Sequence, residues 1–489
     1  MALWPRKLGG NPVVEIPFVG PAYRARSMNL NAQRCVNFYL EAGGPDGRTR
    51  AALIGTPGLV RKLVLPNAPC EVRAAEVFKG ELWVVGGNKL YSITKTWVAT
   101  ERGTLDTSTG NVSIQANNSQ LMLVDGVSGY IWDKPDGTFS RITDPEFPAG
   151  ARSVSYIDSY FVAETPNTEQ FSISALGNGQ DWDGTDFTSA EGAPDNIVAH
   201  LTDHRQLWVL GETTIQIYEN TGNASFPLEA SGTAFIEVGC VAPASAKRFD
   251  NSVVWLGQDE NGQGIVWRAA NYNPARMSDH GLEFAMQSYP RIDDARAFTY
   301  QQDGHTFYVL TFPSADATWH FDAATGTWAE RAWLESGTGK LHRHRANCHA
   351  AFNGQNIVGD WENGILYALD LNTFTDDGSA ILSLRAAPTL ADEQKFLFYG
   401  SLQVDVEAGV GLPTGQGEDP KMMLRYSDDG GHTWSNRREA TMGKIGKYGA
   451  RAKWNRLGRG RNRVFEISIT DPVKRVVLGA YADIEKGTA

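Results

Sequence analysis

The sequence has no segment suited to crossing a bilayer, because no uninterrupted apolar run approaches the roughly eighteen residues that a transmembrane helix needs. Its first ten residues, MALWPRKLGG, also lack the apolar stretch and small-residue cleavage site of a secretion signal. Cysteine is scarce: Cys35, Cys70, Cys240 and Cys348 stand far apart, with no C-x-x-C pair. We therefore expect reduced, buried thiols in a protein that folds in a cytosol.

Catalytic signatures are absent as well. The sequence contains no G-x-S-x-G, no Walker loop, no G-x-G-x-x-G after a strand and no H-E-x-x-H. The acidic pairs Asp293–Asp294 and Asp376–Asp377 lie in turn-like contexts, where carboxylates favour local hydrogen bonds. We therefore expect a protein that is not an enzyme and needs no cofactor.

One cluster of metal-ligand residue types must be weighed against that expectation. The stretch HRHRANCH places His342, His344, Cys348 and His349 within eight residues. On a strand, alternate histidines share a face, which is one way to begin a metal site. The intervening arginines add positive charge, however, and no second group of ligands follows at a suitable spacing. We expect a hydrogen-bonded loop between repeats and no metal.

Positive charge is in the minority, because the sequence has 45 lysines and arginines but 56 aspartates and glutamates, which gives a net charge of −11. Such a chain is not a general nucleic-acid binder, because phosphate contacts require a positive surface. One stretch, residues 443–463, contains no acid at all. Its basic residues are Lys444, Lys447, Arg451, Lys453, Arg456, Arg459, Arg461 and Arg463.

This basic segment has three interpretations. It can be an ordinary solvated face of strands and loops. It can be a subunit interface, where arginines meet carboxylates of a neighbour. It can also contact DNA at a channel mouth. The subunit interface is the functional interpretation that we favour, and we expect Trp454 within the segment to belong to a core or an interface.

The middle of the chain repeats one pattern: a turn with Gly, Asn or Asp, an apolar strand, a second turn, and a strand that ends in an aromatic residue. The copies are FKGELWVVGGNKLYSI (78–93), NNSQLMLVDGVSGYIWD (117–133), IDSYFVAETPNTEQFSIS (157–174), DHRQLWVLGETTIQIYE (203–219), FDNSVVWLGQDENGQGIVWRA (249–269), QDGHTFYVLTFPSADATWHFD (302–322) and FNGQNIVGDWENGILYALD (352–370). Measured between equivalent positions (Leu82, Leu121, Tyr160, Leu207, Val254, Phe307 and Ile357), the copies are 39, 39, 47, 47, 53 and 50 residues apart.

This spacing is typical of four-stranded propeller blades, which repeat at about 40–50 residues. The residues within each copy alternate with a period of two, as half-buried strands require. The sequence therefore predicts an all-β protein in which residues 61–385 form a β-propeller of about six to eight blades. Closure of the ring can use strands from both ends of the chain.

The C-terminal part loses the blade spacing, and its strands are longer, as in FLFYGSLQVDVEAGVG (396–411) and VFEISITDPVKRVVLGAYADIE (464–485). We expect residues 386–489 to form an antiparallel, sandwich-like β-domain that serves as a platform. Residues 1–60 are expected to form an N-terminal arm that completes this domain.

The C-terminal part also contains SDDGGHTW (427–434), which matches the Asp-box found on sialidase propellers. The matching residues are Ser427, Asp429, Gly431, Thr433 and Trp434. An aspartate that accepts backbone hydrogen bonds and two glycines that allow positive φ close a tight turn. We interpret the motif as a structural hairpin, because a single copy carries no catalytic group.

Several stretches in order along the chain resemble one known family. They are QRCVNFYLE (33–41), GTPGL (55–59), the blade series, LRYSDDGGHTWS (424–435) and GKIGKYGARAKWNRLGRGRNRVFEISITDPV (443–473). The chain resembles the packaged-DNA stabilisation proteins of tailed phages, which are the tail-hub or nozzle proteins of P22-like and T7-like short-tailed phages.

The resemblance implies a homohexameric ring in the virion tail, assembled in the host cytoplasm. Such a ring lies below the portal and its head-to-tail adaptor and carries a tail needle, tip, fibre or spike. It closes the channel, retains the packaged double-stranded DNA and conducts it on ejection, without catalysis. Two alternatives stay open: a carbohydrate-binding or sialidase-like propeller, and a propeller scaffold that binds peptides.

Overall fold

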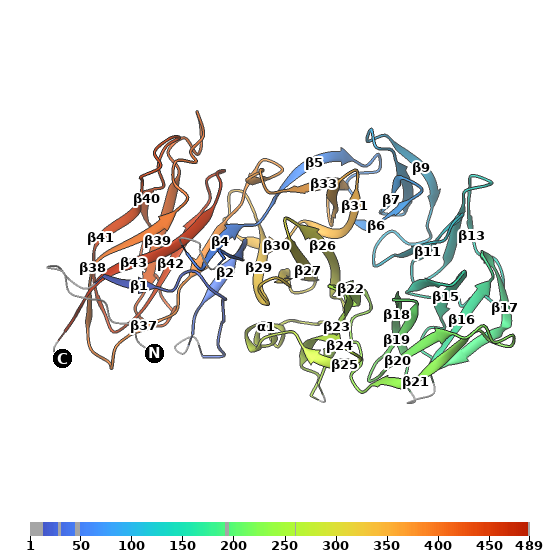
Figure 1. Cartoon of the computed structure of the whole chain (residues 1–489). Coiled ribbons are helices and arrows are strands. Elements are labelled where there is room, and N and C mark those ends of the chain that lie inside the picture. Colours follow the sequence, from blue (N-terminus) through green and yellow to red (C-terminus); the bar gives the residue numbers. More distant parts are fainter. Residues whose placement is uncertain (1–12, 28–30, 45–48, 191–194, 260, 488–489) are drawn as a thin grey trace.

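A computed structural model describes residues 13–27, 31–44, 49–190, 195–259 and 261–487. Figure 1 shows two parts side by side, a propeller and a β-sandwich, with the first and last strands, β1 and β43, both in the sandwich. The predicted all-β fold, a propeller with an additional antiparallel domain, is confirmed. Residues 1–12, on which the expectation of no secretion signal rests, lie outside the described residues. No described helix is long and apolar enough to span a membrane.

Within the described residues the propeller has seven blades, each an antiparallel set of four strands. Blade 1 is β6 (Val72–Phe78), β7 (Glu81–Gly86), β8 (Lys89–Ile93) and β9 (Ala99–Thr104). Blade 2 is β10 (Ser113–Ala116), β11 (Gln120–Val124), β12 (Gly129–Asp133) and β13 (Thr138–Arg141). Blade 3 is β14 (Val154–Ile157), β15 (Tyr160–Glu164), β16 (Gln170–Ala175) and β17 (Asn178–Ser189). Blade 4 is β18 (Ile197–Asp203), β19 (Gln206–Gly211), β20 (Ile215–Asn220) and β21 (Leu228–Ile236).

The ring continues through three further blades. Blade 5 is β22 (Lys247–Phe249), β23 (Ser252–Gln258), β24 (Gly264–Ala270) and β25 (Asn273–Arg276), with the 3-10 turn η1 (Pro243–Ser245) before it and the helix α1 (His280–Met286) after it. Blade 6 is β26 (Arg296–Gln302), β27 (His305–Phe312), β28 (Ala317–Asp322) and β29 (Thr327–Leu334), with the short β30 (Leu341–Arg343) beside β29. Blade 7 is β31 (Ala346–Phe352), β32 (Gln355–Asp360), β33 (Ile365–Asp370) and β5 (Gly58–Val64).

The last blade is closed by a strand from the other end of the chain. β5 pairs antiparallel with β33, from Val64 opposite Ile365 to Gly58 opposite Asp370. The short strands β34 (Thr375–Asp376) and β35 (Ser379–Ala380) lie on the other side of β5. The N-terminal segment therefore locks the propeller ring.

Most blades turn from their first to their second strand through two residues with positive φ. Asp303 and Gly304 (47° and 83°) and Asn353 and Gly354 (52° and 70°) are examples. Paired positive φ values match the right-handed twist of the flanking strands, and Asn, Asp and Gly adopt them readily. The apolar faces of adjacent blades then pack together, as where the rings of Trp83 and Trp132 approach to 5.1 Å between centroids.

The sandwich consists of two sheets with a shared apolar core. One contains β3 (Phe38–Ala42), β4 (Ala51–Gly55), β43 (Val476–Lys486), β38 (Leu397–Val406) and β41 (Ala452–Gly460), and β1 (Val13–Ile16) also pairs with β43. The other contains β2 (Arg34–Val36), β36 (Ser383–Ala386), β42 (Asn462–Ile469), β39 (Lys421–Ser427) and β40 (Arg438–Thr441), with β37 (Leu390–Ala391) beside β42. Leu402, Trp454 and Phe465 are among the core residues between them.

A continuous sheet joins the two parts, because β2 pairs with β29 of blade 6 and with β36 of the sandwich. Asn37, at the end of β2, is buried at this junction with φ of 53°. Its side-chain amide donates to the carbonyls of Ala332 and Leu382 at 2.9 Å each, and its side-chain oxygen accepts the Ala332 N–H at 3.0 Å. Arg34 and Glu330 form an ion pair beside it, with Nη2 and Oε2 2.7 Å apart. The junction is therefore held by specific polar contacts.

Candidate functional site

The basic segment lies on the edge strand of one sandwich sheet and on the loop before it. Figure 1 shows β41 on the side of the sandwich remote from the propeller. Along β41 the apolar side chains of Ala452, Trp454 and Leu457 enter the core, while Lys453 and Arg456 point to solvent. This alternation is what a strand with one buried face requires. The edge strand therefore presents a row of cations.

Seven of the eight predicted basic residues are exposed. They are Lys444, Lys447, Arg451, Lys453, Arg456, Arg459 and Arg461. Lys444 pairs with Glu418 at 2.8 Å, whereas the guanidinium groups of Arg459 and Arg461 lie over the Phe396 ring at 4.6 and 4.2 Å. These seven exposed cations lie on β41 and on the segments directly before and after it, and together we call them the basic edge.

The structure places Arg463 in the interior, where it is 1% exposed. Its guanidinium group donates to the Asp428 carboxylate at 2.6 and 2.7 Å and to the Leu457 carbonyl at 2.6 Å, and lies over the Tyr426 ring. A buried arginine with these partners stabilises the sandwich and offers no surface to a second molecule. Arg463 is therefore not part of the basic edge.

Two large apolar side chains lie among the cations of the loop. Tyr448 is 79% exposed and Ile445 is 60% exposed. Apolar and aromatic groups next to arginines are the composition that protein interfaces favour. The loop and the basic edge together are the part of the described surface best suited to hold a partner.

The Asp-box forms the connection between β39 and β40. Asp429 accepts the Ser427 hydroxyl at 2.6 Å and the Thr433 amide and hydroxyl at 2.9 and 2.6 Å. Gly431 donates its N–H to Ser427 Oγ, and the Trp434 indole donates back to the Gly431 carbonyl. The hydrogen bond from Ser427, followed by those from Thr433, holds the pKa of the Asp429 carboxyl well below its usual range. The polar side chains of Ser427, Asp429, Thr433 and Trp434 are all used within the turn, as a structural hairpin requires.

The HRHRANCH residues point in different directions. His342 Nδ1 contacts Asp316 at 2.7 Å, while His344 is buried and its pKa is well below the ordinary value because of that burial. His349 bonds Asn356 Oδ1 at 3.0 Å. No group of three His, Cys, Asp or Glu side chains among the described residues is arranged to hold a metal ion.

The inner strands of all seven blades surround a channel along the propeller axis, about 510 Å³ in volume. We call it the axial channel. Polar side chains on its wall include Glu76, Gln115, Tyr156, Lys247, Thr299 and His349. Its lining contains a single carboxylate among the described residues, Glu76. Most glycosidases use two opposed carboxyl groups, an arrangement that these lining residues do not provide.

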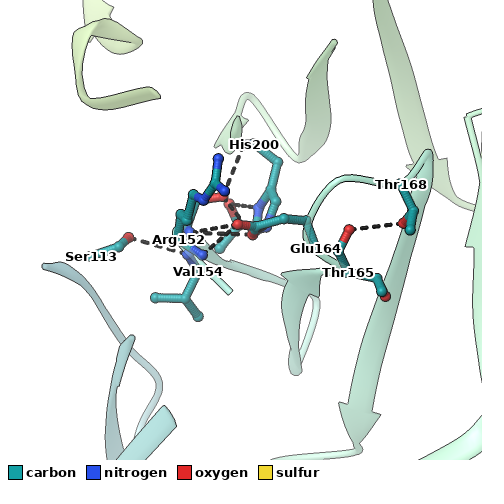
Figure 2. A network of polar contacts seen from close by, with 9 residues as sticks. Ser113, Arg152, Val154, Glu164, Thr165, Thr168 and His200 are labelled. Carbon is teal, nitrogen blue, oxygen red and sulfur yellow. Dashed lines mark hydrogen bonds and ion pairs between the residues drawn. The ribbon is translucent and has the colours of Figure 1, made fainter. Parts of the chain in front are cut away.

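Figure 2 shows a polar network between blades 3 and 4 that the sequence did not reveal, and several of its residues, including His200, line the channel. Glu164 at the end of β15 is buried and accepts the N–H groups of Arg152 and Ser153, at 2.5 and 3.1 Å, and the Ser153 hydroxyl at 2.9 Å. His200 of blade 4 bonds Glu164 at 3.2 Å through Nε2 and Ser155 at 2.7 Å through Nδ1.

The order serine, histidine, glutamate resembles a catalytic triad, but Ser155 is 1% exposed. A nucleophile must reach its substrate, so the network acts as a clamp between blades 3 and 4. In the sequence, His200 of blade 4 lies 36 residues from Glu164 and 45 residues from Ser155, both of blade 3. No local motif could therefore have identified the network.

Two family models match the chain with this architecture. One, described as the β-propeller of bacteriophage P22 Gp10, matches residues 15–374, and the other, described as the Gp10 β-sandwich, matches residues 383–485. The chain belongs to this family. Membership of the Gp10 family makes it a phage structural protein. No curated protein matches the chain.

Solved structures offer weaker likenesses than the Gp10 family does. The computationally designed Ika8 protein is 13% identical, covers 69% of this chain and 99% of its own, and has a TM-score of 0.37. The N-terminal domain of Nup159 is 11% identical, covers 72% of this chain and 97% of its own, and has a TM-score of 0.40. PorZ from Porphyromonas gingivalis is 13% identical, covers 78% of this chain and 46% of its own, and has a TM-score of 0.38. Scores this low support no functional conclusion.

Proposed function

We propose that this chain forms the homohexameric hub, or nozzle, of a phage tail, below the portal and its head-to-tail adaptor. In this proposal the ring closes the channel after packaging, retains the double-stranded DNA and conducts it on ejection. The distal end carries a tail needle, tip, fibre or spike. The ring assembles in the host cytoplasm and ends in the virion tail. Membership of the Gp10 family supports a structural role of this kind.

The basic edge is the observation that carries the proposal. Seven exposed cations gather on one sandwich edge of a chain whose net charge is −11. A basic surface on an acidic chain is complementary to the chain's own surface, and electrostatic complementarity directs association and fixes register. Arginines that lie over Phe396 are held in place, so they lose little side-chain entropy when they bind carboxylates. We therefore assign the basic edge to contacts with a neighbouring copy or with the adaptor.

The size of the axial channel supports a DNA path between copies of the chain. A volume of 510 Å³ holds on the order of seventeen water molecules at about 30 Å³ each, far less than a DNA duplex. In the proposed ring the duplex passes through a lumen that the copies enclose. Net negative charge around that lumen would keep the phosphates from binding and let the duplex slide.

Assembly tests this function directly. We expect the purified chain, alone or with the adaptor protein, to form particles of six copies by sedimentation and a six-fold ring with a central hole by negative-stain microscopy. Phage particles that lack the chain should package DNA and then lose it. A chain that stays monomeric with the adaptor, and is dispensable for DNA retention, would contradict the proposal.

Charge reversal tests the assignment of the surface. Lys453→Glu combined with Arg459→Glu should weaken ring or adaptor assembly at least about tenfold, because it places like charges against the partner. Lys95→Glu combined with Lys134→Glu changes the net charge equally on exposed propeller loops and should leave assembly unchanged. Equal effects of the two pairs would show that only net charge matters.

A further inference from the structure

The axial channel has a volume typical of small-molecule sites, which are about 300–1,000 Å³. Most of its cations are already engaged. Arg73 donates to four backbone carbonyls, Arg296 pairs with Glu71, and Arg248 pairs with Asp203. The Lys247 amine, in contrast, has neither a hydrogen bond nor an ion pair in the part of the chain that the structure describes.

Lys247 and Glu76 face the same space from different blades. Lys247 begins β22 of blade 5, Glu76 lies in β6 of blade 1, and both line the channel. The two groups attract each other electrostatically, but no contact within 4.0 Å joins them among the described residues. The Glu76 carboxylate has one hydrogen bond, from the N–H of Val77 at 3.2 Å. Two opposite charges therefore line the same channel without a direct contact between them among the described residues.

Burial leaves both groups poorly solvated. It lowers the pKa of the Lys247 amine and raises the pKa of the Glu76 carboxyl, in each case as the largest influence. A buried charge is costly unless a partner compensates it. Uncharged polar groups elsewhere in the channel lining, on Gln115, Tyr156 and Thr299, can form hydrogen bonds but cannot supply that charge.

The complement of this site is a small molecule with one negative and one positive group close together. A carboxylate alone would satisfy Lys247 and face Glu76 with like charge, and an amine alone would do the reverse. We propose that the axial channel binds a free α-amino acid, with its carboxylate at Lys247 and its ammonium group at Glu76. This proposal does not depend on the role of the chain in the tail.

Calorimetric titration and thermal shift with glycine and L-serine test the proposal on the full chain. N-acetylglycine and glycinamide are the matched probes, because each retains one of the two charges. We expect both amino acids to bind and to raise the melting temperature, and both blocked compounds to bind at least about tenfold more weakly. Glu76→Gln and Lys247→Met should each weaken glycine binding about tenfold or more, and Lys134→Met on an outer loop should not.

Three outcomes would overturn the proposal: no binding of either amino acid, equal binding of glycine and N-acetylglycine, or glycine binding that survives Glu76→Gln. The second would define a plain anion site, and the third would place the ligand elsewhere. Because Glu76→Gln preserves shape and leaves Lys247 in place, it provides a test even if Lys247→Met fails to fold.

Discussion

Asn37 shows how one side chain can determine a junction. It forms three side-chain hydrogen bonds with backbone groups of the propeller and the sandwich, in a left-handed conformation that asparagine tolerates better than most residues. Arg463 plays a comparable role inside the sandwich, where it joins Asp428 to the Leu457 carbonyl.

Asn37→Ala should lower the free energy of unfolding by about 3 kcal/mol, because it leaves buried backbone groups without partners. Chemical denaturation followed by tryptophan fluorescence measures the change. Asn118→Ala, at an exposed position, should change stability by less than about 0.5 kcal/mol. Similar losses of unfolding free energy in the two variants would show that Asn37 does not specifically stabilise the junction between the propeller and the sandwich.

The cysteines give a prediction of reactivity with pH. Burial raises the pKa of Cys240 and of Cys348 to about 12, and that of Cys35 to about 11. A higher pKa means less thiolate, and a shift of three units lowers its fraction about a thousandfold. At pH 8 a disulfide reagent should therefore leave these three thiols of the native chain unmodified, whereas it should modify all four cysteines of the denatured chain. Rapid native modification of Cys240 or Cys348 would refute this.

At the scale of the element, the repeating unit is a hairpin whose turn controls the register. Blades 6 and 7 place Gly304 and Gly354 at the second turn position, where φ is positive. Blade 3 places Ser159 there, with φ of 79°. A residue with a Cβ is strained in this region, so the turn of blade 3 is less favourable than the glycine-containing turns of blades 6 and 7.

Ser159→Gly should therefore raise the free energy of unfolding by about 0.5–1 kcal/mol, after the greater freedom of glycine in the unfolded chain is allowed for. Gly304→Ser places the same strain in blade 6 and should lower the free energy of unfolding by a similar amount. Thermal unfolding of the two variants measures both effects. Shifts of the same sign would contradict this account of the turns.

The hairpins were predictable because each is local: turn residues and alternating apolar residues lie within about twenty positions of each other. The structure confirms the propeller and the antiparallel domain that this pattern predicted. The use of β5 in blade 7 was not evident, because its sequence, GLVRKLV, is equally compatible with any half-buried strand.

The basic edge was harder to delimit. Arg459, Arg461 and Arg463 would share a face on one continuous strand, but the chain bends at Arg461 and passes from the sheet that contains β41 to the sheet that contains β42. Arg463 therefore points into the core of the sandwich. The Glu164 network and the presence of Lys247 and Glu76 in one channel depend on packing between blades, which a single sequence does not specify.

At the scale of the whole molecule, the ring and the sandwich share strands and therefore share stability. β5 closes the propeller only three residues after β4 joins the sandwich, and Leu59 of β5 is buried between blades 6 and 7. A disturbance of β5 should therefore open the ring at a defined place.

Leu59→Asp should cost at least about 3 kcal/mol, because it removes apolar contacts and buries a charge. Limited proteolysis should then cut preferentially within residues 346–370, the rest of blade 7. Lys62→Asp, on the same strand at a half-exposed position, should leave the proteolytic pattern unchanged. Cleavage spread evenly over the blades would show that β5 does not act as the lock.

Because strands far apart in the sequence pair with each other, they also determine the order in which the two parts can fold during translation. On the ribosome β5 emerges before its partner β33 has been translated, and β1 and β4 emerge before their partner β43. Until then the nascent chain presents open strand edges, the surfaces from which misfolding and aggregation begin. The propeller can close once β33 has been translated, whereas the sandwich must wait for β43, so a premature stop codon between these two strands leaves the sandwich incomplete.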